Sequence, residues 1–407
     1  YTTDYIYEHD QSETQPIYKA MASLNYDAII LGNHDYEYTL PYIQKQYETS
    51  GLKDKVIASN ITDAVTGKHV FNENKIIEKT LKTKAGASVT VKVGVIGESI
   101  PTLSKKRCDY TGVLNGEDMV ANVKKETKIL KDAGADIVVV LAHSGVGSEQ
   151  PALMDENVGY ALTQIDGVDA VLCGHKHSNF CADGTTHYDT YPGVDTKTGL
   201  VNGKNLVMVA NSGQGIGVID LGVSAGKRIV TRKSQIKKTQ INTGINQTIA
   251  AYMDKWGAVF GADSTEILAE LKSSARWQNY FGTVEDSSPI QLLNDMAISY
   301  GLEYQNNDNT ECKGLPVVAA SRYSRYGAGS GLDYYDIKDN FTSADLYQLM
   351  NYRIQLWRYK VTGAQLKEWL EWAASAYETA GSNVITTGSA ISSPSPSPAA
   401  TATPSAT

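Results

Sequence analysis

The sequence predicts an α/β protein, because apolar runs rich in β-branched residues alternate with stretches in which apolar residues recur at helical intervals. Three of the apolar runs end in a short segment that contains histidine: Gly32–Asp35, Ala142–Gly145 and Gly174–His177. Open α/β sheets carry their functional residues beyond the carboxyl ends of the strands. We therefore expect the three segments to meet at one sheet edge and to form a single site.

Strands and helices follow one another along residues 1–242, which we predict to be the first domain. An amphipathic stretch at Pro16–Leu24 precedes the first histidine strand, and a helix with a lysine-rich face is predicted at Met119–Ala133, where Gly134 ends it. Strands are predicted at Ala28–Leu31, Val56–Asn60, Ser88–Ile96, Ile137–Leu141, Ala170–Leu172, Leu206–Ala210, Gly217–Leu221 and Arg228–Ile241.

The second half of the chain is predicted to form a smaller α/β domain at residues 261–380, joined to the first by a connecting helix at residues 243–260. The domain is assigned helices at Pro289–Tyr300, Leu346–Met350 and Ala364–Thr379, and strands at Leu315–Ala320 and Arg353–Val361. We expect Trp369 and Trp372 to pack in its core rather than stack on a ligand. Residues 381–407 are rich in Ser, Pro, Thr and Ala and are predicted to be disordered.

Composition narrows the classes of partner. The chain has 407 residues, 45 Asp and Glu against 37 Lys and Arg, and a net charge of −8, which gives no electrostatic reason to bind a nucleic acid polymer. No apolar run reaches the roughly 18 residues of a transmembrane segment. The four cysteines have no CxxC spacing; Cys173 and Cys181 could pair across the third histidine segment, although buried free thiols are favoured.

The histidine segments suggest a metal site. A lone histidine after a strand is more often a hydrogen-bonded structural residue, but three such segments in one chain favour a shared role. Imidazole nitrogens with amide or carboxylate oxygens suit a borderline divalent ion such as zinc or manganese. His175 and His177 are two residues apart, so in an extended segment they would point to the same side. These residues predict a metal-dependent hydrolase.

In this order, the three segments resemble those of the 5′-nucleotidase family of calcineurin-type metallophosphatases. The stretch from Pro16 through Asp27 to Gly32–Asp35 is most similar to the bacterial 2′,3′-cyclic-nucleotide 2′-phosphodiesterase/3′-nucleotidase branch, and the likeness extends from about Ile17 to about Ala380. The resemblance implies a four-layer α/β/β/α metallophosphatase sandwich followed by a partial α/β substrate-binding domain. It also implies two divalent metal ions, with Zn, Mn or Co expected.

The resemblance assigns the metal ligands. It implies that Asn33, His143 and His175 bind one ion and that His177 binds the second. Asp35 replaces the usual Glu of the first motif, and we expect it to orient ligands by hydrogen bonds.

The resemblance also assigns the residues that act on the substrate. His34 would be the catalytic histidine, held by Glu37 at a position where relatives have Asp or Asn. Arg322 and Arg325 lie in a glycine-rich segment and are candidates for binding the substrate phosphate, because arginine binds phosphate in a bidentate manner; the alternative is a surface turn.

The expected activity is hydrolysis of 2′,3′-cyclic nucleotides and 3′-nucleotides, small-molecule substrates of a monomer located outside the cytoplasm (periplasmic, secreted or on the cell surface). The alternatives are a 5′-nucleotidase or UDP-sugar hydrolase, and a non-catalytic nucleotide-binding surface protein. The family's Asp-x-His and Gly-Asp motifs have no counterpart in the first thirty residues, and its base-binding aromatic pair is also missing. We therefore expect this sequence to be truncated at both ends.

Overall fold

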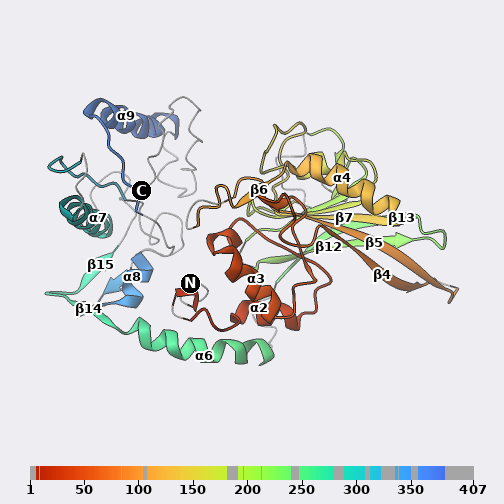
Figure 1. Cartoon of the computed structure of the whole chain (residues 1–407), viewed down its shortest axis with the longest axis horizontal. Coiled ribbons are helices and arrows are strands. Elements are labelled where there is room, and N and C mark those ends of the chain that lie inside the picture. The colour runs from red at the N-terminus through yellow and green to blue at the C-terminus, as the bar shows by residue number, and fades with distance from the viewer. Residues whose placement is uncertain are drawn as a thin grey trace. The chain divides into compact units, whose positions relative to one another are not determined.

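The computed structural model describes residues 6–8, 10–83, 85–103, 108–180, 191–195, 197–211, 213–239, 247–277, 288–307, 312–321, 335–337, 339–349 and 356–380. The chain divides into two compact units, Thr2–Trp256 and Gly257–Thr407. The boundary lies inside the long helix α6, Gln247–Ser264, which corresponds to the predicted connecting helix (Figure 1).

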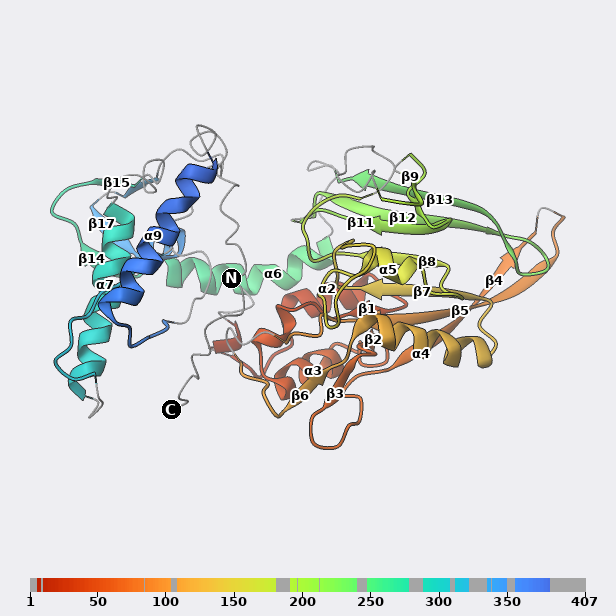
Figure 2. The same cartoon turned by 90° about the horizontal axis from the view of Figure 1, so that it is seen from above.

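A seven-stranded sheet forms the centre of the first unit, with the strand order β4-β5-β7-β8-β11-β10-β9 (Figure 2). Its strands are β4 Asn74–Lys82, β5 Ser88–Glu98, β7 Ile137–Ala142, β8 Ala170–Cys173, β9 Val194–Asp195, β10 Leu200–Val201 and β11 Lys204–Met208. Strands β5, β7, β8 and β11 run parallel to one another. The carboxyl ends of β7 and β8, where two of the histidine segments begin, therefore lie side by side.

The remaining elements of this unit flank the large sheet. They are helices α2 Pro16–Ser23, α3 Leu40–Thr49, α4 Met119–Asp132 and α5 Gly159–Thr163, the 3₁₀ helix η1 Asp35–Glu37, and strands β1 Ile29–Ile30, β2 Val56–Ile57, β3 Ile61–Asp63, β6 Leu114–Gly116, β12 Gly215–Val223 and β13 Ile229–Lys238. Three two-stranded sheets result: β1 pairs with β2, β3 with β6 and β12 with β13.

Two apolar cores separate the layers. The first lies between α4, α5 and the large sheet, and it includes Ile96, Val123 and Val140. The second lies between α2, α3 and the β1–β2 pair, and it includes Leu31 and Ile43. Figure 1 shows α4 on one side of the sheets and α2 and α3 on the other. The predicted four-layer α/β/β/α sandwich is therefore confirmed.

The two sheets approach each other closely at Gly97 near the end of β5. A Cβ atom on Gly97 would lie 2.8 Å from the Ile57 Cβ and 2.9 Å from the Ile30 Cγ2, so only glycine fits between the layers. This contact places the end of β1, which belongs to the small sheet, beside the end of the large sheet. The first histidine segment thus reaches the other two although its strand is in a different sheet.

Both ends of helix α4 lie where the sequence predicts them. The Asp118 side chain accepts a hydrogen bond of 2.8 Å from the Ala121 backbone N–H, which caps the amino terminus. At the other end Gly134 has φ +87°, the left-handed conformation that glycine adopts without strain. The predicted strands of this domain are also present, although β2 covers only Val56–Ile57 of the expected Val56–Asn60. Strand β4 was not predicted, because much of it is exposed and charged.

The second unit contains β14 Ile267–Glu270, β15 Ala275–Trp277, α7 Ser288–Asn307, β16 Tyr335–Ile337, β17 Asn340–Thr342, α8 Ser343–Leu349 and α9 Gly363–Ala380. Strand β14 pairs with β17 and β15 pairs with β16, both antiparallel. Trp277, Ile337 and Leu349 form a small buried core. The three predicted helices are confirmed.

Two predictions for this unit are wrong. Leu315–Ala320 is not a strand: the Leu315 carbonyl accepts a hydrogen bond from the Gln305 side chain of α7 instead of joining a ladder. The described part of the other predicted strand, residues 356–361, is also irregular, and its Arg358 lies 3.3 Å from the Tyr304 ring centroid. Apolar runs predict strands only where a partner strand is available.

The prediction that Trp369 and Trp372 pack in a core is wrong. Their exposed fractions are 47% and 50%, because no described element covers this face of α9. Of the described helices, none has the length and apolarity needed to cross a membrane. Cys173 is a free thiol, as favoured from the sequence, and Cys181 lies outside the described residues.

Candidate metal centre

The first histidine segment follows β1 and turns sharply. The Gly32 N–H donates to the Asp35 Oδ2 at 2.7 Å, and the Asp35 N–H donates to the Gly32 carbonyl at 3.1 Å. Burial raises the pKa of the Asp35 carboxyl to about 6, and the Gly32 N–H opposes the shift by stabilising the charged form. Asp35 therefore holds the turn that carries Asn33 and His34.

His34 and Glu37 form a pair at the surface. The His34 Nδ1 lies 2.8 Å from the Glu37 Oε1; His34 immediately precedes the short helix η1, and Glu37 is its last residue. The His34 side chain is 64% exposed, whereas Glu37 is 23% exposed. A glutamate at this position, one methylene longer than the family's usual residue, thus reaches the imidazole and leaves the His34 Nε2 open to solvent.

His143 follows β7 and meets the first segment. Its backbone N–H donates to the Glu98 carbonyl at 2.8 Å, which extends the β5–β7 ladder by one residue. Its Nε2 lies 2.8 Å from the Asn33 Oδ1. Burial and then the nearby His175, His34 and His177 lower the pKa of His143 to about 4. The imidazole is therefore neutral at physiological pH, the form that binds metals.

The third segment brings in His175 and His177 through an unusual backbone. Both residues have positive φ, +68° for His175 and +52° for His177, a conformation that favours glycine. The segment is consequently not extended, so the strand-like conformation on which the expectation of a shared side rested is wrong. The His143 and His175 ring centroids are 5.1 Å apart. Burial lowers the pKa of His175 as well.

The loop after His143 adds one residue, Glu156, that was not predicted. Glu156 Oε2 lies 3.4 Å from the His175 Nε2, and the Thr102 hydroxyl donates to the other oxygen of Glu156. Nothing in the spacing of Glu156, thirteen positions after His143 in a polar loop, distinguishes it from the other carboxylates of that loop. Only the folded loop brings it to the histidines.

The donor atoms that lie near one another here suit a divalent ion in kind. An amide oxygen and two neutral imidazoles from Asn33, His143 and His175 converge, and such ligands bind Zn²⁺ and Mn²⁺. Within the described ranges, no three His, Cys, Asp or Glu side chains by themselves form an ion site. Residues strained in the left-handed region are common at functional sites, which agrees with this arrangement.

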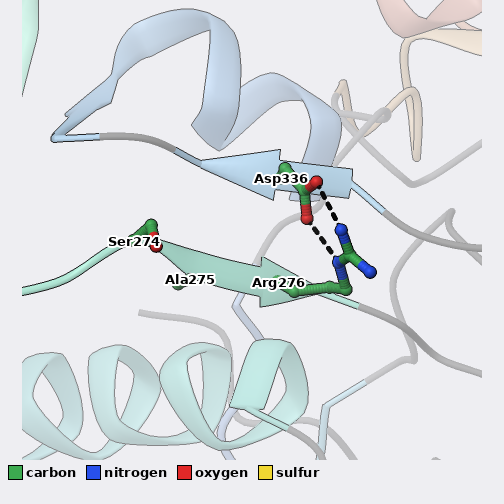
Figure 3. Close-up of a pocket in the computed structure, with 4 residues that line it drawn as sticks. All are labelled: Ser274, Ala275, Arg276 and Asp336. Atoms are coloured by element: carbon green, nitrogen blue, oxygen red, sulfur yellow. Dashed lines mark hydrogen bonds and ion pairs between the residues drawn. The ribbon is translucent and has the colours of Figure 1, made fainter.

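Arg322 and Arg325, the candidate phosphate ligands, lie outside the described residues. The second unit has a pocket of about 210 Å³ lined by Ser274, Ala275, Arg276 and Asp336 (Figure 3). Arg276 is committed there to a bidentate ion pair, with Nε 2.6 Å and Nη2 2.8 Å from the two carboxylate oxygens of Asp336. This pair joins strands β15 and β16 and leaves the guanidinium little capacity for a phosphate.

The close packing of Gly32 on His143 gives a test of the site. A Cβ atom added at Gly32 would lie 2.8 Å from the His143 Cε1, so Gly32→Ala is expected to push the imidazole away from Asn33. We expect Zn²⁺ affinity to fall at least tenfold with little change in melting temperature. Gly51→Ala is an unsuitable control because Gly51 has φ +75°, but Gly257→Ala, in a helix with open space around it, is suitable. Unchanged Zn²⁺ affinity in Gly32→Ala would contradict the placement of His143.

Comparison with known proteins agrees with the fold and the motifs. Residues 2–179 match the calcineurin-like phosphoesterase family, and residues 294–393 match the 5′-nucleotidase C-terminal domain. The chain is 30% identical to a 2′,3′-cyclic-nucleotide 2′-phosphodiesterase/3′-nucleotidase of Salmonella typhimurium and 27% identical to that of Yersinia enterocolitica. In both cases the match covers 90% of this chain and 57% of the relative, so the chain spans little more than half of their length.

A solved structure gives the same result. The calcineurin-like phosphoesterase YfkN from Bacillus subtilis aligns with a TM-score of 0.57 and 27% identity. The alignment covers 63% of this chain and 79% of the solved chain.

Proposed function

We propose that the protein hydrolyses phosphate esters of nucleotides. The proposal starts from the match of residues 2–179 to the calcineurin-like phosphoesterases and of residues 294–393 to the 5′-nucleotidase C-terminal domain family. Its preferred substrates are 2′,3′-cyclic nucleotides, opened at the 2′ bond, and 3′-nucleotides. The observation that carries the proposal is the 2.8 Å approach of Asn33 Oδ1 to His143 Nε2, with His34 in the same segment as Asn33.

The family uses divalent metal ions, and this chain offers ligands for them. Asn33, His143 and His175 would hold one ion, and His177 would contribute to a second; Zn, Mn or Co suits such nitrogen and oxygen donors. Bound ions supply hydroxide near neutral pH and neutralise the charge of the phosphate.

The chain's own residues orient the substrate and move a proton. Glu37 accepts a hydrogen bond from the Nδ1–H of His34, which fixes the ring with Nε2 outward. When the ring also carries a proton on Nε2, as the imidazolium, Nε2–H can donate to a phosphate oxygen or give that proton to the departing sugar oxygen, which leaves the neutral ring with its Nδ1–H on Glu37. Positioned proton transfer of this kind typically contributes about 10²–10⁴-fold. His143 and His175, neutral at physiological pH, keep their lone pairs available for ion binding.

The organisation of the protein forms part of the proposal. Residues 1–242 would carry the chemistry, residues 243–260 would connect the domains, and residues 261–380 would bind the nucleotide with help from Arg322 and Arg325. A small phosphate ester is the substrate class that fits a chain of net charge −8, because placed ligands rather than bulk charge must hold it.

We also propose that the protein is a monomer located outside the cytoplasm. The Ser-, Thr- and Pro-rich composition of residues 381–407 resembles that of stalks in surface proteins. Light scattering on the purified protein measures the first property. Fractionation of cells that carry a tagged gene measures the second, and a purely cytoplasmic tag would contradict it.

The activity is tested on the protein in the length that its gene encodes. Initial rates are measured on 2′,3′-cyclic AMP, 3′-AMP, 5′-AMP and UDP-glucose with Mn²⁺ or Zn²⁺. We expect kcat/KM for the first two to exceed the others at least tenfold. A preference for 5′-AMP would instead assign the protein to the 5′-nucleotidases. If the protein binds nucleotide but turns over no substrate and takes up no metal, it is a non-catalytic protein and the proposal is overturned.

A further inference from the structure

The loop between β7 and α5 contributes a carboxylate to the candidate metal centre. Glu156 Oε2 lies 3.4 Å from the His175 Nε2, and no residue assignment made from the motifs included it. The side chain of Glu156 is 37% exposed while that of His175 is 18% exposed, so the carboxylate approaches the ring from the solvent side.

The loop is anchored immediately after Glu156. The next residue, Asn157, accepts a hydrogen bond of 3.0 Å from the Gly145 N–H through its Oδ1. The Ser144 hydroxyl oxygen accepts from the Val158 N–H at 2.8 Å. The base of the loop is thus closed immediately beside Glu156. Its position relative to His175 is therefore set by the hydrogen bonds of the two following residues as well as by the ion pair.

The carboxylate itself has a second partner. The Thr102 hydroxyl, from the segment that follows β5, donates to the Glu156 Oε1. With Oε1 bound to Thr102, Oε2 is the oxygen directed at His175. A hydrogen bond to one ring nitrogen of a metal-binding histidine decides which nitrogen carries the proton and which is left for the metal.

We propose that Glu156 is the positioning residue of His175: its carboxylate holds the proton on Nε2 and leaves Nδ1 as the nitrogen that binds the ion. The inference rests on the proposed function, because it concerns the same metal centre. It distinguishes His175 from His143, whose Nε2 instead faces the Asn33 oxygen and is the nitrogen directed into the site. The two histidines would therefore present opposite ring nitrogens.

The chemical consequence is twofold. A carboxylate behind the ring makes the free nitrogen a stronger donor, and it keeps the ring from rotating when no ion is bound. Loss of such a partner typically costs about 10–100-fold in metal affinity or activity. Thr102, which acts on Glu156 only, should have a smaller effect.

The first experiment measures Zn²⁺ affinity of the full protein by competition with a chromophoric chelator. We expect Glu156→Ala to weaken Zn²⁺ binding by about 10–100-fold and Thr102→Val by less. Glu149→Gln, which changes a carboxylate in the same loop, serves as the matched control and should leave the affinity unchanged. His143→Ala tests the centre itself.

These outcomes separate the two proposals. If His143→Ala does not weaken Zn²⁺ binding, the proposed metal centre is wrong. If His143→Ala weakens it but Glu156→Ala and Thr102→Val do not, the centre stands and the role of Glu156 is wrong.

The second experiment observes the proton directly. Long-range ¹⁵N–¹H spectra of the metal-free protein distinguish the two imidazole tautomers by their nitrogen shifts. We expect His175 to carry its proton on Nε2, and to become a mixture of tautomers in Glu156→Ala. A wild-type His175 protonated on Nδ1 would overturn the inference, whatever the metal affinities are.

Discussion

Replacing His34 by Ala is expected to lower kcat on 3′-AMP by about 10²–10⁴-fold while leaving Zn²⁺ affinity within about twofold of wild type. The imidazole is the only described histidine ring among the site residues that is both exposed and paired with a carboxylate of its own segment. It is not among the residues expected to hold the ions. Loss of the ring should therefore remove proton transfer and charge stabilisation without emptying the metal centre.

Two further variants sharpen this test. Glu37→Gln removes the charge beside Nδ1 and offers an amide N–H that can donate to that nitrogen and select the wrong tautomer, so kcat should also fall, by up to about 10⁴-fold. His69→Ala is the matched control, because His69 also lies near a glutamate, 3.8 Å from Glu73, in a different part of the unit. Phosphate release by His34→Ala at the wild-type rate would show that this histidine has no catalytic role.

Glu98→Gln is expected to stabilise the protein at neutral and alkaline pH. Glu98 is fully buried, and burial raises the pKa of its carboxyl well above the usual range. The Asn122 side chain opposes this shift by donating a hydrogen bond of 2.8 Å to Oε1, whereas the charge of Glu126 adds to it. Among the described residues, its Oε2 has no hydrogen-bond partner. A protonated acid and a primary amide make similar demands on such a site, so glutamine replaces the neutral form with little structural change.

The direction of the pH dependence follows from the raised pKa. In the unfolded chain the carboxyl ionises near pH 4.3, whereas in the folded protein it stays protonated. The contribution of Glu98 to the free energy of unfolding is therefore fully present below about pH 4.3. It is lost as the pH rises toward the folded-state pKa, by roughly 1.4 kcal/mol per pH unit. Glu98→Gln should remove this slope. Lys125 and Glu117, the other charged groups near Glu98, are the same in both proteins.

Urea unfolding at several pH values measures this effect. The control is Glu78→Gln, since Glu78 lies on the same sheet but has an exposed side chain. Identical pH profiles for Glu98→Gln and wild type would mean that Glu98 is ionised in the folded protein. The result bears on the site as well, because the Glu98 carbonyl holds the backbone of His143.

Sequence patterns were sufficient for the parts of the fold that depend on local order. Strands β7 and β8 are uninterrupted apolar runs because they are covered on both faces, and α4 carries its own cap and stop signals. The histidine motifs identified the residues expected to come together, and the structure brings Asn33, His143 and His175 into one place.

Features that depend on distant contacts were missed or mistaken. The role of Glu156 arises from a loop closure that no spacing reveals, and the positive φ of His175 and His177 contradicts the conformation expected of histidines. In the apolar run at Leu315–Ala320, the Leu315 carbonyl accepts a hydrogen bond from a glutamine side chain instead of from a neighbouring strand. Trp369 and Trp372 have an amphipathic spacing, but spacing alone does not supply the surface that would cover them.

The left-handed conformation of His175 and His177 has a consequence for how an ion would enter. A non-glycine residue in this region costs on the order of 1–3 kcal/mol and persists only where its surroundings enforce it. Here the Gly174 N–H donates to the Ser144 carbonyl at 3.0 Å and the Lys176 N–H to the Gly174 carbonyl at 2.7 Å, so the turn is closed before any ligand arrives. The backbone that carries His175 and His177 would therefore need no rearrangement when a cation binds, so no free energy of binding would be spent on ordering it.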